Sequence, residues 1–242
     1  MPKRYSLRTL GAVLGIIMLA SGFAFSAPDK ETGVSADEAL RELIDGNKQY
    51  VENIPTDGTK NNSAARAALA RTQKPYAIIL TCSDSRVPPE IIFNKGLGEI
   101  FVIRVAGNIP DPVVLGSIEY AAEHLGSSLI MVLGHERCGA VTAAVEAHGK
   151  TTGSSNIDAI VKIIEPSVRE ARNSCDACKG GKDCDGTGKS EFVECVVDAN
   201  AKRVAAGLTK RSGILRHLVE NKKIKIVAAK YDLDEGTVTL YK

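Results

Sequence analysis

The chain has 242 residues, of which 44% are hydrophobic and 25% are charged, with a formal net charge of +2 at pH 7. This length provides for one substantial hydrophobic core or at most two domains. Nothing in the composition suggests the concentrated basic face that nucleic-acid binding needs, so we expect no nucleic-acid partner.

The first 26 residues have the pattern of a secretory signal peptide. Three basic residues and no acidic residue precede a short apolar run, LGAVLGIIMLASGFAF, and a polar stretch follows it. Small residues favour cleavage near Ser26 or Ala27. The run is short for a membrane span, which needs about 20 residues, although an uncleaved N-terminal anchor is the alternative. We therefore expect a secreted protein of the bacterial periplasm, with no stable membrane association after cleavage.

Residues 27–242 are expected to form a single domain that begins with a helix over residues 35–53. Ser35 and Glu38 have the spacing of a capping box, and apolar residues follow at roughly helical intervals. The next stretch, residues 54–70, predicts a loop and a short alanine-rich helix.

Four short apolar runs predict buried β-strands, because each is nearly continuous, as strands covered on both faces are. They span residues 76–82, 99–105, 128–135 and 224–233. Helical patterns separate the later runs, over residues 112–126, 140–148 and 213–222. This alternation predicts an α/β fold with a mostly parallel central β-sheet flanked by helices. The last residues, after Gly236, predict a C-terminal edge strand.

The stretch from residue 173 to residue 195 differs from the rest of the domain. It is rich in glycine, lysine and aspartate, so we interpret it as a surface insertion that is too polar for the core. It also holds four of the six cysteines, at Cys175, Cys178, Cys184 and Cys195. In an exported protein these cysteines can form disulfides. Export favours disulfides, although the CxxC spacing alone is also compatible with a second, structural metal site.

Two clusters of chemically active side chains follow the first and third predicted strands. The segment TCSDSRV places Cys82, Asp84 and Arg86 at alternate positions, which is one face of an extended segment. The segment GHERCGAV contributes His135 and Cys138. Since parallel strands bring their carboxyl ends to one edge of a sheet, we expect these five side chains to meet there.

Two cysteines and one histidine are a known ligand set for catalytic zinc, which keeps a fourth position open. An ion pair between Asp84 and Arg86 would hold the carboxylate away from the metal and leave that position to water. Two simpler interpretations remain. Cys82 and Cys138 could form a disulfide in an exported protein, or His135 could be a structural histidine.

CSDSRV followed by GHERCGAV resembles the β-class carbonic anhydrases. Other segments in the same order also resemble the family and extend the likeness over residues 35–172 and 192–240: ALRELIDGNKQY, QKPYAIILTCSDSRV, EIFVIRVAGN, GSIEYAAEHLG and IVAAKYDLDEGTVTL. The resemblance implies a carbonate dehydratase, a zinc lyase that converts CO2 reversibly to bicarbonate and a proton by zinc-bound hydroxide. It also implies a homodimer or higher homo-oligomer with active sites near the subunit interface.

The resemblance assigns roles to individual residues. It implies one catalytic Zn²⁺ per chain and a catalytic dyad of Asp84 and Arg86. The implied zinc ligands are Cys82, His135 and Cys138, and the implied substrate-binding residues are Gln73, Gly139, Phe101 and Tyr120. Two alternatives stay open for the function: a hydrolase of the same fold acting on COS or CS2, and an inactive zinc-binding homologue.

Overall fold

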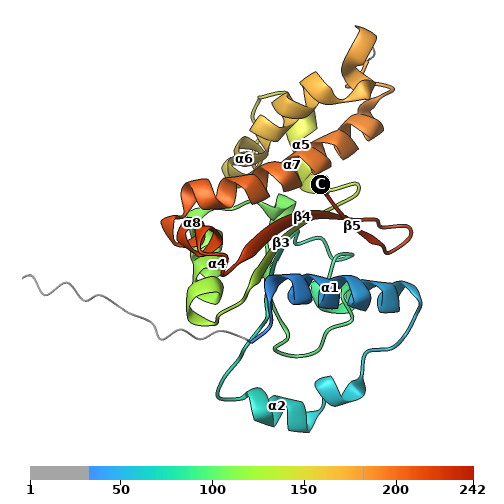
Figure 1. Ribbon diagram of the computed structural model, residues 1–242. Coiled ribbons are helices and arrows are strands. Elements are labelled where there is room, and N and C mark those ends of the chain that lie inside the picture. The colour runs from blue at the N-terminus through green and yellow to red at the C-terminus, as the bar shows by residue number, and fades with distance from the viewer. Residues whose placement is uncertain (1–32, 182) are drawn as a thin grey trace, which may run out of the picture.

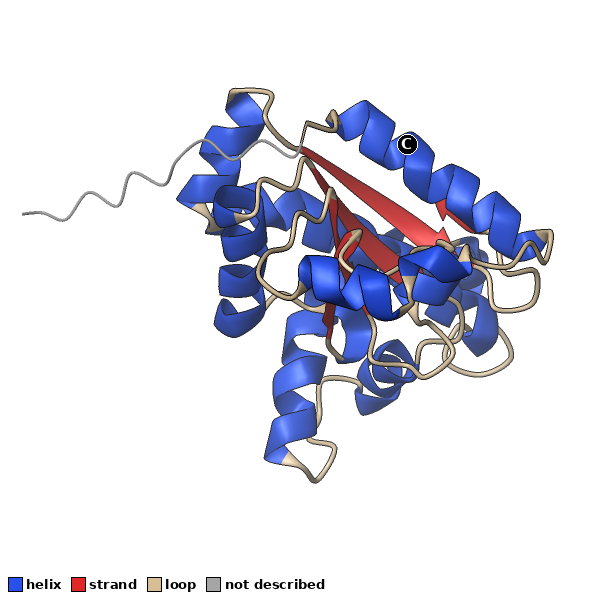
Figure 2. Ribbon diagram, turned by 90° about the horizontal axis from the view of Figure 1, so that it is seen from below, coloured by secondary structure: helices blue, strands red, loops and turns tan. Residues whose placement is uncertain are grey.

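A five-stranded sheet crosses the molecule, and helices cover both of its faces (Figure 1). The structure is a computed structural model and describes residues 33–181 and 183–242, so the predicted signal peptide lies outside the described residues. The strand order is β2-β1-β3-β4-β5. Figure 2 shows the strands splayed relative to one another between the helices, as the twist of a β-sheet requires.

The first four strands are parallel, and only the last is antiparallel. They are β1 (Ala77–Thr81), β2 (Ile100–Arg104), β3 (Leu129–His135), β4 (Lys225–Tyr231) and the antiparallel edge strand β5 (Val238–Leu240). Every residue of β1 and β3 is buried, which is why these segments read as continuous apolar runs. The predicted fold class is confirmed.

One face of the sheet is covered by α1 (Ala36–Val51). The side chain of Ser35 caps this helix by accepting a hydrogen bond from the N–H of Glu38, 3.2 Å away. Leu43 packs with Met131 of β3 in one core cluster. The adjoining short elements are η1 (Gly58–Lys60), α2 (Ser63–Leu69) and α3 (Pro89–Ile92). In Figure 1, α2 lies at the bottom of the view, away from the sheet.

The other face is covered by a larger group of helices. They are α4 (Pro112–His124), α5 (Gly139–Ala147), α7 (Lys189–Arg211) and α8 (Gly213–Glu220), and α6 (Ser155–Ser174) lies against α5 and α7. Two 3₁₀ turns complete this layer, η2 (Ala106–Asn108) and η3 (Asp176–Gly181). Over the described part of the chain, no helix combines the length and apolar character needed to cross a membrane.

The two longest helices among the described residues, α6 and α7, were not predicted from the sequence. Helix α6 contains Pro166, a residue that usually ends a helix. Helix α7 has no clear apolar stripe and begins inside the polar stretch that was predicted as an insertion. The periodicity that reveals an amphipathic helix is weak in α7. In α6 it is present, since Val161, Ile164, Val168 and Ala171 are buried at helical spacing, and the sequence prediction missed it.

The structure corrects the interpretation of residues 173–195. Helix α7 begins at Lys189, and Phe192 and Val193 are buried in the core with residues of α5 and α6. Thus the end of the stretch is part of the core rather than a polar insertion. The structure also decides between the two alternatives for its cysteines, which form two disulfides, Cys175–Cys195 and Cys178–Cys184.

Candidate metal centre

The carboxyl ends of β1 and β3 bring two cysteines and a histidine together. The strands are neighbours, with Thr81 opposite Leu133, so Cys82 emerges beside the end of β3. His135 is the last residue of β3, and Cys138 is the N-cap of α5. The two sulfurs and a ring nitrogen of His135 all lie within 4.8 Å of one another. The strand ends therefore meet as the sequence predicted.

The three side chains fit a zinc ion. The sulfurs of Cys82 and Cys138 are 3.9 Å apart and unbonded, close to the roughly 3.8 Å edge of a tetrahedron with Zn–S bonds of about 2.3 Å. The Nδ1 of His135 lies 2.8 Å from the carbonyl of Glu136, so this nitrogen donates and Nε2 carries the lone pair. That Nε2 is buried and lacks a hydrogen-bond partner. A buried polar atom without a partner is costly, and a metal ion would satisfy it.

The two thiols differ in acidity. Their mutual hydrogen bond, together with donors that include the N–H of Gly107, lowers the pKa of Cys82 to about 4. The same hydrogen bond and burial raise the pKa of Cys138. Backbone N–H groups of Ala140 and Val141, at the start of α5, partly oppose that rise. One thiolate is thus available to a cation at neutral pH, and cation binding would displace the remaining proton.

Asp84 and Arg86 face each other because the chain turns after β1. The strand ends at Thr81, and a turn from Asp84 to Val87 is closed by a 3.0 Å backbone hydrogen bond. The proposed alternation along one extended face is therefore wrong, although the two side chains do meet. The Nε of Arg86 donates to Oδ1 of Asp84 at 2.9 Å, and Nη2 donates to Oδ2 at 2.7 Å.

This bidentate clamp keeps Asp84 ionised and close to the candidate metal ligands. The Arg86 side chain lowers the pKa of Asp84 well below its usual range, and the backbone N–H of Arg86 adds a 3.0 Å hydrogen bond to Oδ1. The Oδ2 atom lies 3.9 Å from Nε2 of His135. The site therefore combines a cation-binding cluster with a fixed carboxylate that accepts hydrogen bonds.

Comparison with known proteins identifies this arrangement. A model of the carbonic anhydrase family matches residues 77–238. Carbonic anhydrase 2 of Mycobacterium tuberculosis is 38% identical over 208 residues, which cover 86% of this chain and 92% of that protein. The chain belongs to the β-carbonic anhydrase family.

Solved structures share the fold of this chain. The structure of the β-carbonic anhydrase CcaA has a TM-score of 0.66 and 23% identity, and the match covers 84% of this chain and 87% of that one. A structure described as a tetrameric β-carbonic anhydrase of Sordaria macrospora has a TM-score of 0.63 and 22% identity, with 74% of this chain and 86% of that one covered. Family membership supports carbonate dehydratase activity.

A buried chain of polar groups behind this carbonic anhydrase site was not found from the sequence. The N–H of Gly107 donates to the sulfur of Cys82 at 3.3 Å. The carbonyl of the same residue accepts from Nδ2 of Asn200 at 2.9 Å, and Oδ1 of Asn200 accepts from Ser167 at 3.2 Å. Gly107 is left-handed, with φ of 72°, and a Cβ there would approach Ile164 Cδ1 to 2.7 Å. Asn200 lies on a helix that was not predicted from the sequence. Its contact with Gly107, the residue that donates to the Cys82 sulfur, is therefore seen only in the structure.

The predicted substrate residues divide into two groups. Gly139 starts α5 directly after Cys138 and is exposed, and outside its chain neighbours and its own helix no atom lies within 4 Å of where its Cβ would be. Gln73 precedes β1 and is exposed, whereas Cys82 follows that strand. Phe101 pairs with Ile78 near the start of β2, also far from the carboxyl edge.

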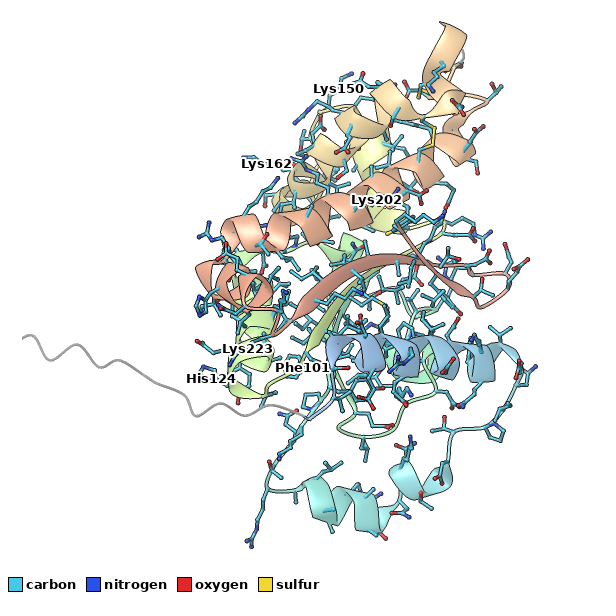
Figure 3. The ribbon with its side chains drawn as sticks, viewed as in Figure 1. Phe101, His124, Lys150, Lys162, Lys202 and Lys223 are labelled. Carbon is cyan, nitrogen blue, oxygen red and sulfur yellow. A yellow bond between two sulfur atoms is a disulfide. The ribbon has the colours of Figure 1, made fainter. Side chains whose placement is uncertain are left out.

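Tyr120 is likewise outside the cluster. It is 49% exposed on α4, and its ring contacts that of His124 with 5.3 Å between centroids. Figure 3 labels Phe101 and His124 toward the lower end of the view, away from α5. A single chain therefore brings Gly139 to the metal centre but does not bring Gln73, Phe101 or Tyr120 there.

Proposed function

We propose that this chain is a zinc-dependent carbonic anhydrase that converts CO2 reversibly to bicarbonate and a proton. The observation that carries the proposal is the buried cluster of Cys82, His135 and Cys138, with an unpartnered Nε2, beside a carboxylate clamped by Arg86. Two thiolates and an imidazole would hold zinc with a fourth position open. Zinc in such a site supplies hydroxide near neutral pH by lowering the pKa of water.

The chain's own residues would orient the reacting atoms. Asp84 is ionised and has no proton to give, so Oδ2 accepts a hydrogen bond from the attacking oxygen and directs its lone pair toward carbon. Arg86 restrains the carboxylate through two hydrogen bonds, which keeps it from turning onto the cluster. The N–H of Gly139, at the positive end of α5, would contact an oxygen of the substrate in the adjacent open space.

We propose that the active form is a homo-oligomer in which a second copy completes the site. The Sordaria macrospora protein is described as tetrameric, and this supports an oligomer for a chain of the same fold. Gln73 and Tyr120 are exposed and lie outside the cluster of their own chain, so a partner could present them. Sedimentation would give the mass of the assembly.

Mixing two inactive variants tests the shared site directly. Cys82→Ser removes a metal ligand, and Gln73→Ala removes a residue that the partner would supply. If the site is shared, co-refolded variants should regain hydration activity, because one site of each hybrid dimer is intact. Activity of the mixture equal to the sum of the separate variants would contradict sharing.

We also propose that the protein is exported to the bacterial periplasm after cleavage near Ser26 or Ala27. The two disulfides support an oxidising compartment, because disulfides rarely persist in the cytosol. Intact-mass measurement of protein from the native host checks this proposal. A full-length mass in the cytosolic fraction would contradict it.

Stopped-flow hydration of CO2 by mature protein with a measured zinc content tests the proposed reaction. We expect one zinc per chain and rapid hydration. Faster turnover of COS or CS2 than of CO2 would favour a hydrolase of the same fold instead. Zinc-loaded protein without hydration would identify an inactive homologue.

A further inference from the structure

The loop between His135 and Cys138 has an unusual backbone conformation. Arg137, in the middle of this loop, has φ of 49°, in the left-handed region that residues other than glycine seldom adopt. The loop turns the chain from the end of β3 into α5, and this turn allows both flanking side chains to face the metal centre. Something outside the loop must stabilise that conformation.

Glu194 of α7 makes one of the long-range contacts to this turn. The segment after β4 makes others, through Asp234 to the Arg137 side chain at 2.8 Å and through the N–H of Leu233 to Glu136 at 3.3 Å. Only Glu194 accepts a hydrogen bond from the backbone N–H of Arg137 among the contacts of the described residues. The N–H of Arg137 donates to Oε1 of Glu194 at 2.8 Å, across 57 residues of sequence. The other carboxylate oxygen, Oε2, lies 2.6 Å from Nζ of Lys230. Lys230 also approaches Asp198, one helical turn further along α7, at 3.3 Å. Glu194 thus has a charge partner in β4 and, independently, a hydrogen bond to the loop between two candidate metal ligands.

A disulfide anchors the part of α7 that carries Glu194. The next residue, Cys195, is bonded to Cys175, which is the C-cap of α6 and is buried. Phe192, two residues before Glu194, is fully buried in the same core. The second disulfide, Cys178–Cys184, closes a loop of its own before α7 begins and does not involve the helix.

We propose that Glu194 is a positioning residue that holds the His135–Cys138 loop in its metal-binding conformation, and that the Cys175–Cys195 disulfide keeps Glu194 in place. This inference rests on the proposed zinc site. It assigns the cysteine-rich segment a role at the metal centre, although none of its four cysteines is a ligand. Removal of the contact should loosen the loop and speed the release of zinc.

The rate of zinc release distinguishes two roles for Glu194: accepting a hydrogen bond from the loop, and pairing its charge with Lys230. Full-length mature protein is loaded with zinc, and transfer of the metal to a chromogenic chelator is followed over time. Glu194→Asp keeps the charge near Lys230 but is too short to reach the N–H of Arg137, so release should be about 10- to 100-fold faster. Glu194→Gln keeps the length and an acceptor, so its release rate should stay within a few-fold of the wild type.

The opposite order would overturn the proposal. If Glu194 served only as the partner of Lys230, Glu194→Asp would behave like wild type and Glu194→Gln would be the damaged variant. Asp198→Asn is the matched control, because Asp198 approaches the same lysine from the same helix without touching the loop. Its zinc release should be unchanged. The visible spectrum of cobalt-substituted Glu194→Asp should also differ from that of the wild type, since the ligand geometry changes.

The two disulfides provide a second matched pair. Removing Cys175–Cys195 by a double change to serine should speed zinc release, whereas the same change at Cys178 and Cys184 should not. Equal release rates would overturn the role of the disulfide. Reduction of Cys175–Cys195 in folded, zinc-loaded wild type gives the same comparison without a substitution, and unchanged release after reduction would also overturn it. Wild-type protein that binds no zinc would instead defeat the proposed function itself. Zinc-loaded wild type with unaltered release in Glu194→Asp would defeat only the positioning role.

Discussion

Two pairs of cysteines in this chain are in different chemical states, one as free thiols and one as a disulfide. Cys82 and Cys138 are 5% and 2% exposed, and Cys175 is as deeply buried at 3%. The first two are held 3.9 Å apart by β1 and α5, well beyond a disulfide bond of about 2.05 Å. Cys175 instead lies at the end of α6, beside Cys195 of α7, and the two are bonded.

The surroundings of the sulfurs, rather than their burial, explain this difference. Backbone N–H groups of Gly107, Ala140 and Val141 interact with the sulfurs of the first pair and favour negative charge on them. Cys82 is therefore a thiolate at neutral pH, and cation binding would displace the proton that remains on Cys138. The second pair joins two helix ends, where a covalent bond limits relative movement. The same residue type thus serves a candidate metal centre in one region and a structural link in the other.

Replacing one candidate metal ligand should have the largest effect on zinc binding and activity, and replacing disulfide cysteines should not have this effect. Cys138→Ser removes the thiolate that closes the cluster, so zinc affinity should fall by more than about 10²-fold and hydration activity should be lost. Metal analysis and stopped-flow kinetics measure both. Serine at Cys178 and Cys184 together is the control and should leave zinc content unchanged. Active, zinc-loaded protein with a disulfide between Cys82 and Cys138 would contradict the assignment.

Arg86→Ala should abolish the restraint on Asp84 while leaving the metal in place. The freed carboxylate can turn onto the metal, so hydration should fall by roughly 10²-fold or more with zinc retained. The side chain of Arg86 is 51% exposed, so little stability should be lost. Arg86→Lys should recover little, because an ammonium group cannot reproduce the two parallel hydrogen bonds.

The variant Arg86→Ala with Asp84→Ala distinguishes restraint from fold support. It should restore an open coordination position without restoring orientation, and X-ray absorption would report the coordination in each variant. Wild-type hydration rates in zinc-replete Arg86→Ala would show that the ion pair has no role in the reaction.

Asn200→Asp tests the polar chain behind Cys82. Aspartate has nearly the same shape but cannot donate to the carbonyl of Gly107, so the N–H bonded to the Cys82 sulfur loses its support. Zinc affinity should fall by about 10-fold, and the free energy of unfolding by about 1–3 kcal/mol. Ser167→Ala, which removes only the outer donor, should have a smaller effect on both quantities. Equal zinc affinity in Asn200→Asp and wild type would refute the prediction.

The two disulfides should differ modestly in their effect on stability. The Cys175–Cys195 bond spans 20 residues of sequence and Cys178–Cys184 spans 6. Loop-closure entropy predicts a loss of about 3 kcal/mol for the first and about 2 kcal/mol for the second. Urea unfolding of the two double-serine variants measures both losses. A larger loss for the shorter loop would show that local packing outweighs chain entropy in this segment.

The sequence by itself was sufficient to predict the parallel sheet and the proximity of the TCSDSRV and GHERCGAV segments. Central strands that are buried on both faces are apolar at every position, so β1 and β3 can be predicted from continuous apolar runs in the sequence. Parallel pairing then places Cys82 and His135 at one edge whatever the surrounding helices do. The residue types themselves predicted a zinc site and an Asp84–Arg86 ion pair, whereas the roles of the substrate residues were implied only by the family resemblance.

Tertiary structure alone decided the rest. Helix α7 lacks a clear periodic signal, so nothing local indicated that Phe192 would enter the core or that Asn200 would support Gly107 beside Cys82. The meeting of Asp84 with Arg86 also depends on a turn rather than on strand alternation. The pairing of cysteines required knowledge of which helix ends are neighbours. The core position of Phe192, the contact of Asn200 with Gly107 and the Cys175–Cys195 pairing are long-range, since each joins segments that become neighbours only after the chain has folded.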